Sequence, residues 1–368
     1  MKNFKNKTAL VLGHTGFKGS WLSTWLSSLG ANVIGLSKDV PTNPSNFESS
    51  EIDTFVEDNR ADIKDLSAVK RIMDKCQPDF IFHLAAQPLV RLSYELPIET
   101  IATNALGTAN VLEALRSLQK DAVAIIITSD KAYDNVEWKW GYREIDRLGG
   151  KDPYSASKGM AELVTRSYME SFFRSTNSNI RLGIARAGNV IGGGDWAMDR
   201  IVPDCMQAWS KGRTVEIRKP NATRPWQHVL EPLSGYLLLA SNLSQKNHLN
   251  GEAYNFGPSD NLNLPVSSLI NEMSKYWNNV SWKDVSQSGE DLYEAGLLKL
   301  NCDKALADMS WAPSLFFEET VRLTVDWYKQ YYENPKSKGG KSMQEFTMNQ
   351  ISEYTKLAED RGMIWTKI

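Results

Sequence analysis

Apolar and polar positions alternate along the first half of the chain with two periods, one typical of strands and one typical of helices. Short apolar runs predict strands at residues 8–12, 32–36, 79–84, 123–128 and 180–185. Helical spacing of apolar residues predicts helices at residues 19–29, 65–75, 97–118 and 155–173. The run VAIIIT at residues 123–128 is typical of a strand that is buried on both faces. This alternation predicts an α/β fold with a Rossmann-like, doubly wound parallel sheet.

The pattern changes after Gly188, where a Gly/Trp loop leads into shorter pieces rich in Pro, Asn and aromatic residues. Further helices are predicted at residues 201–211, 267–277 and 317–332. We therefore expect a smaller C-terminal α/β domain, which binds substrate, beside the sheet. The expected division is a first domain at residues 1–187, completed by about 228–256, a second at 188–227 and 257–332, and a tail at 333–368. The tail begins with a solvated linker, Lys336–Ser342, and ends in a helix that packs on the body or on a partner subunit.

Composition narrows the class of protein. The 42 Lys and Arg residues nearly balance the 44 Asp and Glu residues, so charge gives no case for nucleic acid or an anionic membrane as partner. No apolar run is long enough for a membrane span or a signal peptide. The three cysteines lie far apart without a C-x-x-C pair, and the four histidines lack metal-ligand spacing. We expect a cytoplasmic protein with reduced thiols and no metal site.

Three glycines follow the first predicted strand as G-x-x-G-x-x-G: Gly13, Gly16 and Gly19. Glycines at a strand-to-helix turn let the backbone approach a pyrophosphate, and the amides of the helix N-terminus face its charge. The alternative is a Gly-rich turn without a ligand, but the position directly after an N-terminal strand favours a dinucleotide. Asp39, at the end of the second strand, suits the ribose of NAD, whereas the adjacent Lys38 suits a 2′-phosphate, so NADP stays open.

Tyr154 and Lys158 form Y-x-x-x-K at the start of a predicted helix, one turn apart on the same face. A lysine ammonium there would lower the pKa of the phenol, which makes Tyr154 a candidate base. Thr128 ends the buried strand just before Asp130 and Lys131. Asp130 and Lys131 could be a solvated turn. However, elimination of water needs a base at one carbon and an acid at the leaving hydroxyl, and this pair could supply both.

Six stretches of the chain resemble the CDP-glucose 4,6-dehydratases, members of the extended short-chain dehydrogenase/reductase family. They are GHTGFKGSWL (13–22), TSDKAYDN (128–135), PYSASK (153–158), RAGNVIGGGDW (186–196), DRIVPD (199–204) and RPWQHVLEPLSGY (224–236). The resemblance covers roughly residues 7–330. Asp130-Lys131 is its sharper feature, because the related dTDP-glucose dehydratases have Asp-Glu there. One departure is Tyr293-Glu294-Ala295, which stands where His-Glu-Ala is expected.

The resemblance implies conversion of CDP-D-glucose to CDP-4-dehydro-6-deoxy-D-glucose and water, with NAD regenerated in each cycle. Tyr154, aided by Thr128 and Lys158, would take the C4 hydroxyl proton. Lys131 would then remove the C5 proton, and Asp130 would protonate the departing C6 hydroxyl. Another sugar-nucleotide 4,6-dehydratase and a sugar-nucleotide C4 epimerase remain alternatives, and a catalytically silent NAD-binding protein is a third.

The resemblance also implies the remaining site residues. Arg200 and Arg224 are candidate diphosphate ligands, because a guanidinium fork matches phosphate oxygens, although a surface ion pair is the alternative. The full cofactor set is Gly13, Thr15, Gly16, Phe17, Lys18, Gly19, Asp39, Asp62, Ile63, Ala85, Ala86, Gln87, Asn104, Thr128, Tyr154 and Lys158. The substrate set is Asn189, Arg200, Val202, Arg224 and His228. The helices at 97–118 and 155–173 correspond to the pair that forms a four-helix interface in this family, so we expect a homodimer or higher homo-oligomer.

Overall fold

The computed structural model describes residues 2–175, 177–245, 247–259, 263–278, 280–286, 297–333 and 342–367. The expected linker up to Lys341 and the tripeptide at residues 293–295 lie outside these residues. Within the described part, no helix is both long enough and apolar enough to cross a membrane.

A seven-stranded sheet forms the centre of the molecule, with strand order β11-β6-β5-β4-β1-β2-β3. All of its strand pairs are parallel. The strands are β1 (Thr8–Leu12), β2 (Asn32–Ser37), β3 (Glu57–Arg60), β4 (Phe80–His83), β5 (Ala122–Ile127), β6 (Ile180–Arg186) and β11 (Ala253–Asn255). From β1 the chain first adds β2 and β3 on one side and then β4, β5 and β6 on the other, so the strand order reverses between β1 and β4. In doubly wound sheets, ligands bind in the crevice at the carboxyl ends of the two strands where this reversal occurs. The doubly wound parallel sheet and its five predicted strands are confirmed.

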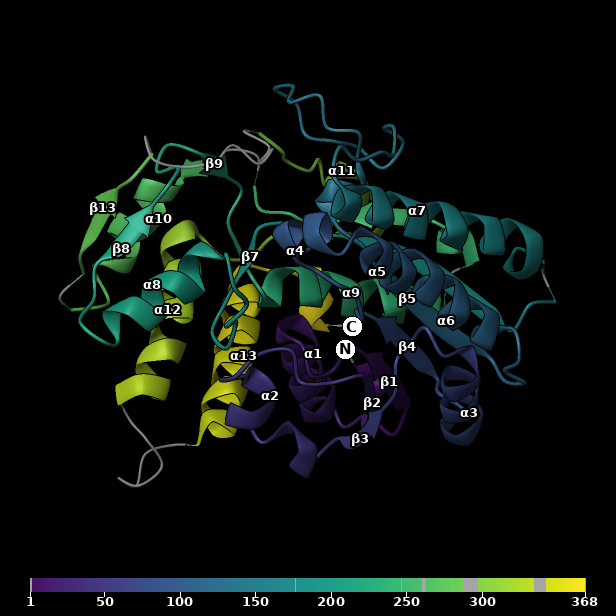
Figure 1. Ribbon diagram of the computed structural model, residues 1–368. Helices are drawn as coiled ribbons and strands as arrows, with labels where there is room; N and C mark the ends of the chain where they lie inside the picture. Colours follow the sequence, from purple (N-terminus) through teal and green to yellow (C-terminus); the bar gives the residue numbers. More distant parts are fainter. Residues whose placement is uncertain are drawn as a thin grey trace.

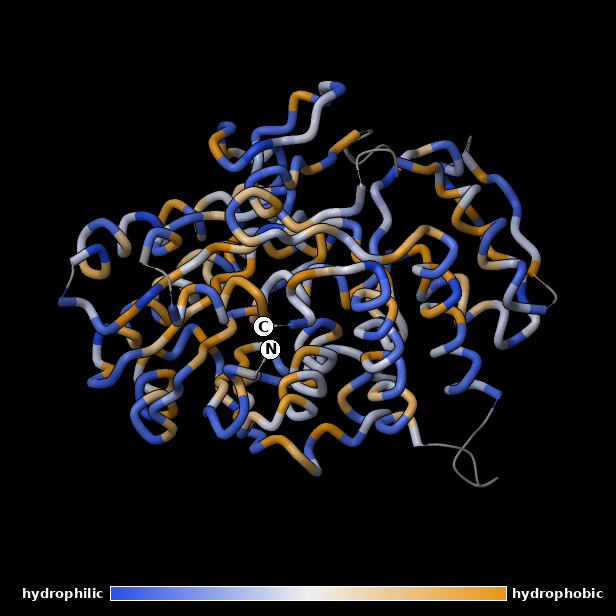
Figure 2. The backbone as a smooth tube through the Cα atoms, turned by 180° about the vertical axis from the view of Figure 1, so that it is seen from behind, coloured by the Kyte–Doolittle hydropathy of each residue, from blue (hydrophilic) through white to orange (hydrophobic). Residues whose placement is uncertain are grey.

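Helices cover both faces of this sheet (Figure 1). The α3 (Leu66–Cys76), α6 (Gly107–Leu115) and α7 (Pro153–Tyr168) helices pack beside one another on one face. On the other face lie α1 (Phe17–Ser28) and α9 (Leu230–Leu243), whose residues are all buried. Successive strand residues point to opposite faces, so Val11 enters the α1/α9 core while Leu10 and Leu12 enter the α3/α6/α7 core. Figure 2 shows the corresponding apolar centre and polar periphery along the chain.

Two strands of the central sheet, β3 and β11, were not predicted, and one predicted helix is not a single α-helix. The sequence of β3, Glu-Asp-Asn-Arg, has no apolar signal because the strand lies at the sheet edge with mostly exposed side chains. The region predicted as one helix at 97–118 contains α5 (Pro97–Ile101), a π-helical turn (Ala102–Leu106) and α6. A further helix, α4 (Val90–Glu95), precedes it. A π-helical turn, Met169–Phe173, likewise ends the helix that begins with α7.

The smaller part of the molecule carries three two-stranded sheets. They pair β7 (Val190–Ile191) with β10 (Gln227–His228), β9 (Thr223–Arg224) with β12 (Leu264–Pro265), and β8 (Val215–Ile217) with β13 (Trp282–Asp284). The predicted helices of this part are present as α8 (Ile201–Trp209), α10 (Val266–Met273) and α12 (Phe317–Glu333). Two short helices, α2 (Asn46–Ser49) and α11 (Asp303–Met309), were not predicted.

The predicted terminal helix is α13 (Met343–Asp360), and it packs against α1 and α12 of its own chain. Tyr354 of α13 lies edge-on to Trp25 of α1 and stacks on Trp365. The Tyr354 hydroxyl donates to Glu231 Oε2 of α9 at 2.9 Å. Burial raises the pKa of Glu231 to about 7, although its carboxylate accepts further hydrogen bonds from the Ser314 and Leu315 amides. The tail is therefore anchored in the core.

Candidate active site

A cavity of about 990 Å³ opens at the carboxyl ends of β1, β4 and β5 and extends to the small sheets. It brings together residues that are far apart in the sequence. The predicted site residues that line it are Gly13, Thr15, Gly16, Phe17, Lys18, Gly19, Asp39, Asp62, Ile63, Ala85, Ala86, Gln87, Thr128, Asp130, Lys131, Tyr154, Lys158, Asn189, Arg200, Val202 and Arg224. Asn104 and His228 are not among its lining residues.

The glycine loop lies so close to its neighbours that two positions have no room for a side chain. Gly13 has φ +91°, and a Cβ there would lie 2.7 Å from the Ala85 amide nitrogen at the end of β4. A Cβ on Gly19 would lie 2.0 Å from the Gly13 carbonyl oxygen. Gly16 is the N-cap of α1 and makes no side-chain hydrogen bond to the helix. A helix N-terminus capped by bare backbone beside a cavity is the geometry that binds a phosphate group.

His14 supports this loop, and sequence reasoning did not single it out. Its ring is buried, with Nδ1 2.9 Å from Ser37 Oγ of β2 and Nε2 3.0 Å from Asp58 Oδ1 of β3. A Cβ on Gly35 would overlap the ring, which shows how tightly it packs. Burial lowers the pKa of His14, partly offset by Asp58. The glycine loop is thus tied to two neighbouring strands.

The predicted ribose acid, Asp39, is exposed at the cavity, and its carbonyl oxygen accepts a 2.7 Å hydrogen bond from Thr15 Oγ1. The neighbouring Lys38 forms a 3.7 Å ion pair with Asp62 on the adjacent strand connection. The Lys38 ammonium, which could recognise a 2′-phosphate, is therefore already paired with the Asp62 carboxylate.

Asn104 is fully buried and acts behind the cavity wall. It lies in the π-helical turn, where its side chain accepts from the Gln87 amide at 2.8 Å and donates to the Gln87 carbonyl at 3.0 Å. Its amide also donates to Ser157 Oγ of α7 at 2.8 Å. Because Ser157 lies between Tyr154 and Lys158, Asn104 couples the wall after β4 to the helix that carries the predicted base.

Tyr154 and Lys158 lie on successive turns of α7, and both are about nine-tenths buried. Burial raises the pKa of Tyr154 to about 12 and lowers that of Lys158 to about 8, the latter opposed by the charge of Glu162 one turn further on. The pKa of Tyr154 is therefore raised overall in this structure, and the expected lowering by Lys158 finds no support in it. Loss of water from around the phenol outweighs the favourable charges near it, among which Arg200 is one.

Thr128 follows β5 and is buried, and its hydroxyl donates to Glu162 Oε1 at 2.7 Å. Ser129, its neighbour, lowers the pKa of the Tyr154 phenol. The contact between Thr128 and Glu162 was not predicted from the sequence, because Glu162 carries no motif signal beyond its place two turns after Tyr154.

The Asp130 carboxylate is 3% exposed and is held by two side chains. Ser129 Oγ donates to Asp130 Oδ1 at 2.9 Å, and Asn189 Nδ2 donates to Oδ2 at 3.3 Å. A Cβ on Gly188 would lie 2.0 Å from Oδ2, so Asp130 rests directly on the Gly188 backbone. Asp130 and Lys131 lie in one short 3-10 turn that lines the cavity, rather than in a solvated surface loop.

The predicted phosphate ligands line the part of the cavity that α8 and the small sheets form. Arg200, the N-cap of α8, forms an ion pair of 2.6 Å with Asp195. Arg224 lines the cavity from β9 and donates to the Thr223 carbonyl at 2.8 Å. Val202 of α8 is buried at its wall. Trp196 and Trp226 are buried and also line the cavity.

Two more arginines that were not predicted also line the cavity. Arg91 of α4 and Arg218, just after β8, contact the same Asp199 Oδ1, at 3.3 Å and 3.4 Å. No sequence signal could reveal Arg91, because α4 itself was missed. Lys18 of α1 adds a fifth cation, whose pKa burial and the neighbouring Arg200 lower to about 8. This half of the cavity suits an anionic ligand.

His228 does not reach the cavity. It is fully buried in β10, edge-on to Trp21 of α1 at 5.9 Å between ring centroids, and burial lowers its pKa to about 3. Its predicted contact with substrate therefore has no support in this structure. His83 of β4 is also buried, with its Nε2 3.0 Å from Thr108 Oγ1.

A family model described as GDP-mannose 4,6 dehydratase matches residues 10–324 of the chain. The chain belongs to this dehydratase family. One curated relative is a CDP-glucose 4,6-dehydratase of Salmonella typhimurium. It is 44% identical to this chain, and the aligned region covers 96% of this chain and 98% of the relative. A dTDP-glucose 4,6-dehydratase of Haemophilus influenzae is 25% identical over 87% of this chain and 97% of its own.

Solved structures of other proteins have the same fold as this chain. The epimerase Mth375 of Methanothermobacter thermautotrophicus has a TM-score of 0.77 at 24% identity, over 92% of this chain and 96% of that one. A UDP-glucuronic acid 4-epimerase of Bacillus cereus, in complex with UDP-glucuronic acid and NAD, has a TM-score of 0.74 at 21% identity, over 88% of this chain and 100% of that one.

Proposed function

We propose that the chain is a CDP-D-glucose 4,6-dehydratase that forms CDP-4-dehydro-6-deoxy-D-glucose and water. The main observation behind the proposal is that two groups of residues suited to proton transfer line the same cavity. Thr128, Tyr154 and Lys158 suit oxidation at a hydroxyl carbon, and Asp130 and Lys131 suit elimination of water. The extensive identity to a CDP-glucose 4,6-dehydratase supports the choice of substrate.

NAD fits the cavity because the glycine loop excludes side chains at Gly13 and Gly19 and the bare Gly16 cap faces the space. We propose that Asp39 holds the adenosine ribose and that Lys158 holds the nicotinamide ribose. The pairing of Lys38 with Asp62 favours NAD over NADP. When bound, NAD supplies the acceptor for the C4 hydride and returns that hydride to C6.

In the proposed reaction Tyr154 removes the proton from the C4 hydroxyl. The resulting C4 carbonyl acidifies the C5 proton, which Lys131 takes. Asp130 protonates the C6 hydroxyl, and the C6–O bond breaks to release water. Its contacts with Ser129 and Asn189 hold the Asp130 carboxyl at the cavity wall, so the acid and the base approach the sugar from the same turn. Lys131 would return its proton to C5 when C6 receives the hydride, so the oxidation level of the sugar nucleotide is unchanged overall.

The cationic half of the cavity is the proposed diphosphate site. Arg200 and Arg224 would bind the phosphate oxygens, with Arg91 and Arg218 at the margin. Asn189 is expected to contact the substrate. Its side chain donates to Asp130 in this structure, so it would contact the substrate next to the Asp130 carboxyl. We propose that residues 1–187 with 228–256 form the cofactor domain and that 188–227 with 257–332 form the substrate domain.

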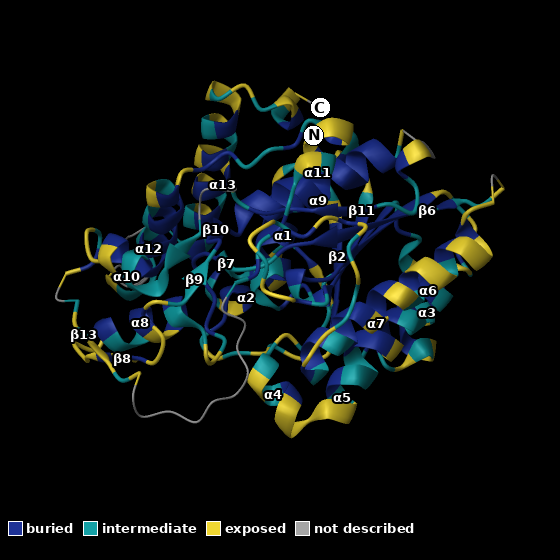
Figure 3. Ribbon diagram, turned by 90° about the horizontal axis from the view of Figure 1, so that it is seen from above, coloured by how far each residue is buried: buried dark blue, intermediate teal, exposed yellow. Residues whose placement is uncertain are grey.

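We further propose a cytoplasmic homodimer. Five apolar side chains on the α5–α7 side are 40–78% exposed: Ile98, Leu106, Met160, Leu163 and Phe172. The α5 and α7 helices lie side by side, and the chain is exposed from the end of α4 to the start of α5, at residues 94–98 (Figure 3). An apolar surface of this kind on neighbouring helices suits the four-helix interface expected from the sequence.

Mass spectrometry of CDP-glucose incubated with purified protein, without added reductant, tests the reaction. Loss of one water, with a carbonyl that borohydride traps, is the expected result. An unchanged mass with inverted C4 stereochemistry would show an epimerase instead. No reaction would remove CDP-glucose as substrate, and dTDP-glucose and GDP-mannose would then be the next probes.

A further inference from the structure

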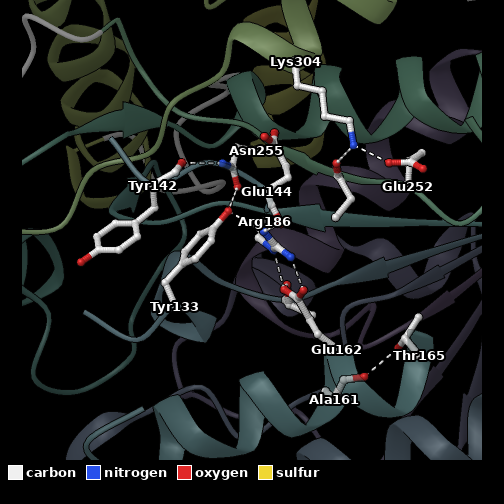
Figure 4. A network of polar contacts seen from close by, with 12 residues as sticks. Tyr133, Tyr142, Glu144, Ala161, Glu162, Thr165, Arg186, Glu252, Asn255 and Lys304 are labelled. Atoms are coloured by element: carbon white, nitrogen blue, oxygen red, sulfur yellow. Dashed lines mark hydrogen bonds and ion pairs between the residues drawn. The ribbon is translucent and has the colours of Figure 1, made fainter. Parts of the chain in front are cut away.

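Behind the catalytic set lies a buried network of charged and polar side chains that the proposed reaction does not use. Its centre is the ion pair between Glu162 of α7 and Arg186 of β6, both with 0% exposure. Arg186 binds both carboxylate oxygens, through Nε to Oε1 at 2.7 Å and through Nη2 to Oε2. Figure 4 shows this two-point contact. A buried pair of this geometry is costly to break because the remaining charge would be uncompensated.

The pair is fixed from several elements. The Arg186 guanidinium hydrogen-bonds to the Tyr133 hydroxyl and lies over the Tyr133 ring at 4.6 Å. Tyr133 in turn donates to Asn255 Oδ1 of β11 at 2.8 Å. Glu144 closes the network, accepting from the Asn255 amide at 2.8 Å (Figure 4). Since Tyr133 follows Asp130 and Lys131 by only a few residues, the network also anchors the turn that carries them.

One contact joins this network to the cavity. The Thr128 hydroxyl donates its only proton to Glu162 Oε1 at 2.7 Å. A threonine hydroxyl has a single O–H donor and two acceptor lone pairs. While this bond holds, Thr128 presents acceptor capacity alone to the cavity that it lines.

We propose that Glu162, held by Arg186, is a positioning residue that fixes the rotamer and hydroxyl direction of Thr128. The inference rests on the proposed dehydratase function and adds to it a residue that touches neither substrate nor cofactor. Its consequence is that the C4 proton passes directly to Tyr154, because Thr128 cannot give up its own proton in a relay without breaking the bond to Glu162. The charge of Glu162 also lies one helical turn from the Lys158 side chain.

The ionisable groups around Tyr154 and Lys158 come from several elements, so the pH profile reports their sum. They are Glu162 and Asp152 of α7 and its cap, Asp130 after β5, Lys18 of α1, His83 of β4, and Arg200 before α8. Removal of the Glu162 charge should lower the pKa of Lys158, because that carboxylate favours the ammonium form. The limb of the rate profile that reports Lys158 should therefore move to lower pH.

A double-mutant cycle with CDP-glucose as substrate tests the proposal. We expect Thr128→Val and Glu162→Gln each to lower kcat by about 10²-fold, with KM changed little. The double variant should be no slower than Thr128→Val, because Glu162 acts through Thr128. Glu162→Gln should also shift the pH profile of kcat to lower pH. Thr165→Val is the matched control and should leave the profile in place, because it removes a buried hydroxyl that donates to the Ala161 carbonyl of the same helix.

Multiplicative losses in the double variant, or an unmoved pH profile, would overturn the proposal. If Glu162→Gln does not fold with Arg186 left uncompensated, Glu162→Leu with Arg186→Met removes both charges together. That variant should fold and lose activity as Thr128→Val does, and wild-type activity in it would equally refute the positioning role. Failure of the wild-type chain to dehydrate CDP-glucose would count against the proposed function alone, before any variant is compared.

Discussion

At the scale of single residues, the site depends on a few places where backbone and side chain nearly touch. Gly188 is the clearest, because its missing Cβ makes room for the Asp130 carboxylate. The same carboxylate is then oriented by Ser129 and Asn189. Gly188 has no positive φ, so a glycine is not required here by the backbone conformation. It is required because a side chain would occupy the space of the Asp130 carboxylate.

Gly188→Ala should therefore displace Asp130 and lower the rate of dehydration by about 10-fold or more, since small displacements of a catalytic group are costly. NAD affinity should not change, because the glycine loop lies elsewhere. The control is Gly257→Ala, where a Cβ meets its nearest atom at 3.5 Å. Steady-state kinetics and cofactor titration of the two variants would settle the comparison, and equal rates in both would contradict the role given to Gly188.

Lys131→Met separates the two chemical stages. Without an amine at this position the C5 proton should stay in place, so dehydration should fall by about 10²-fold or more. Oxidation at C4 should still occur, visible as the near-ultraviolet absorbance of the reduced nicotinamide. Lys139→Met is the control, because Lys139 is exposed and is not among the residues that line the cavity. Normal dehydration by the Lys131 variant would exclude Lys131 as the base.

At the scale of elements, sequence and structure agree where burial is uniform and differ where tertiary contacts decide. The run at 123–128 is buried throughout, with all but its last residue in β5, and Tyr154 and Lys158 share a helical face as their spacing requires. The four polar residues of β3 pair with β2 only because the sheet provides an edge. Arg91 and Glu162 join the site through the path of the chain in space, and no local pattern encodes that path.

The junction of α9 and α13 has a pH dependence of its own. Glu231 has a pKa of about 7 in the folded protein, mainly because of burial, against 4.5 as the ordinary value. The folded state therefore binds an extra proton at Glu231 between these values. The contribution of Glu231 to stability is fully present below about pH 4.5 and is lost as pH rises to about 7. Glu231→Gln should flatten this fall, which is on the order of 3 kcal/mol.

Urea unfolding at pH 5 and pH 7.5 measures the difference between wild type and Glu231→Gln. Glu318→Gln, on the exposed first turn of α12, serves as the control and should follow the wild type. A wild-type slope retained by the Glu231 variant would mean that another group, such as Asp204 with its raised pKa, causes the fall.

At the scale of the whole molecule, the proposed dimer uses the exposed apolar side chains of α5 and α7. Ile98→Glu combined with Leu163→Glu should give a monomer, because two carboxylates would be buried at the interface. Light scattering after gel filtration measures the mass. Ile145→Glu, at an equally exposed position outside this face, should remain dimeric. A monomeric wild type would refute the interface outright.

The cation-rich half of the cavity also spans the whole molecule, since Arg91 comes from beside the large sheet and Arg218 from the small one. Both already contact Asp199, and Arg200 already contacts Asp195. A nucleotide diphosphate that arrives here exchanges one set of anions for another instead of meeting bare charge. The free energy of binding is then the difference between the interaction of the arginines with the diphosphate and their interaction with Asp199 and Asp195. This difference keeps the affinity for the nucleotide moderate. Product carries the same diphosphate as substrate, so the carboxylates of the chain compete for the arginines and speed its departure.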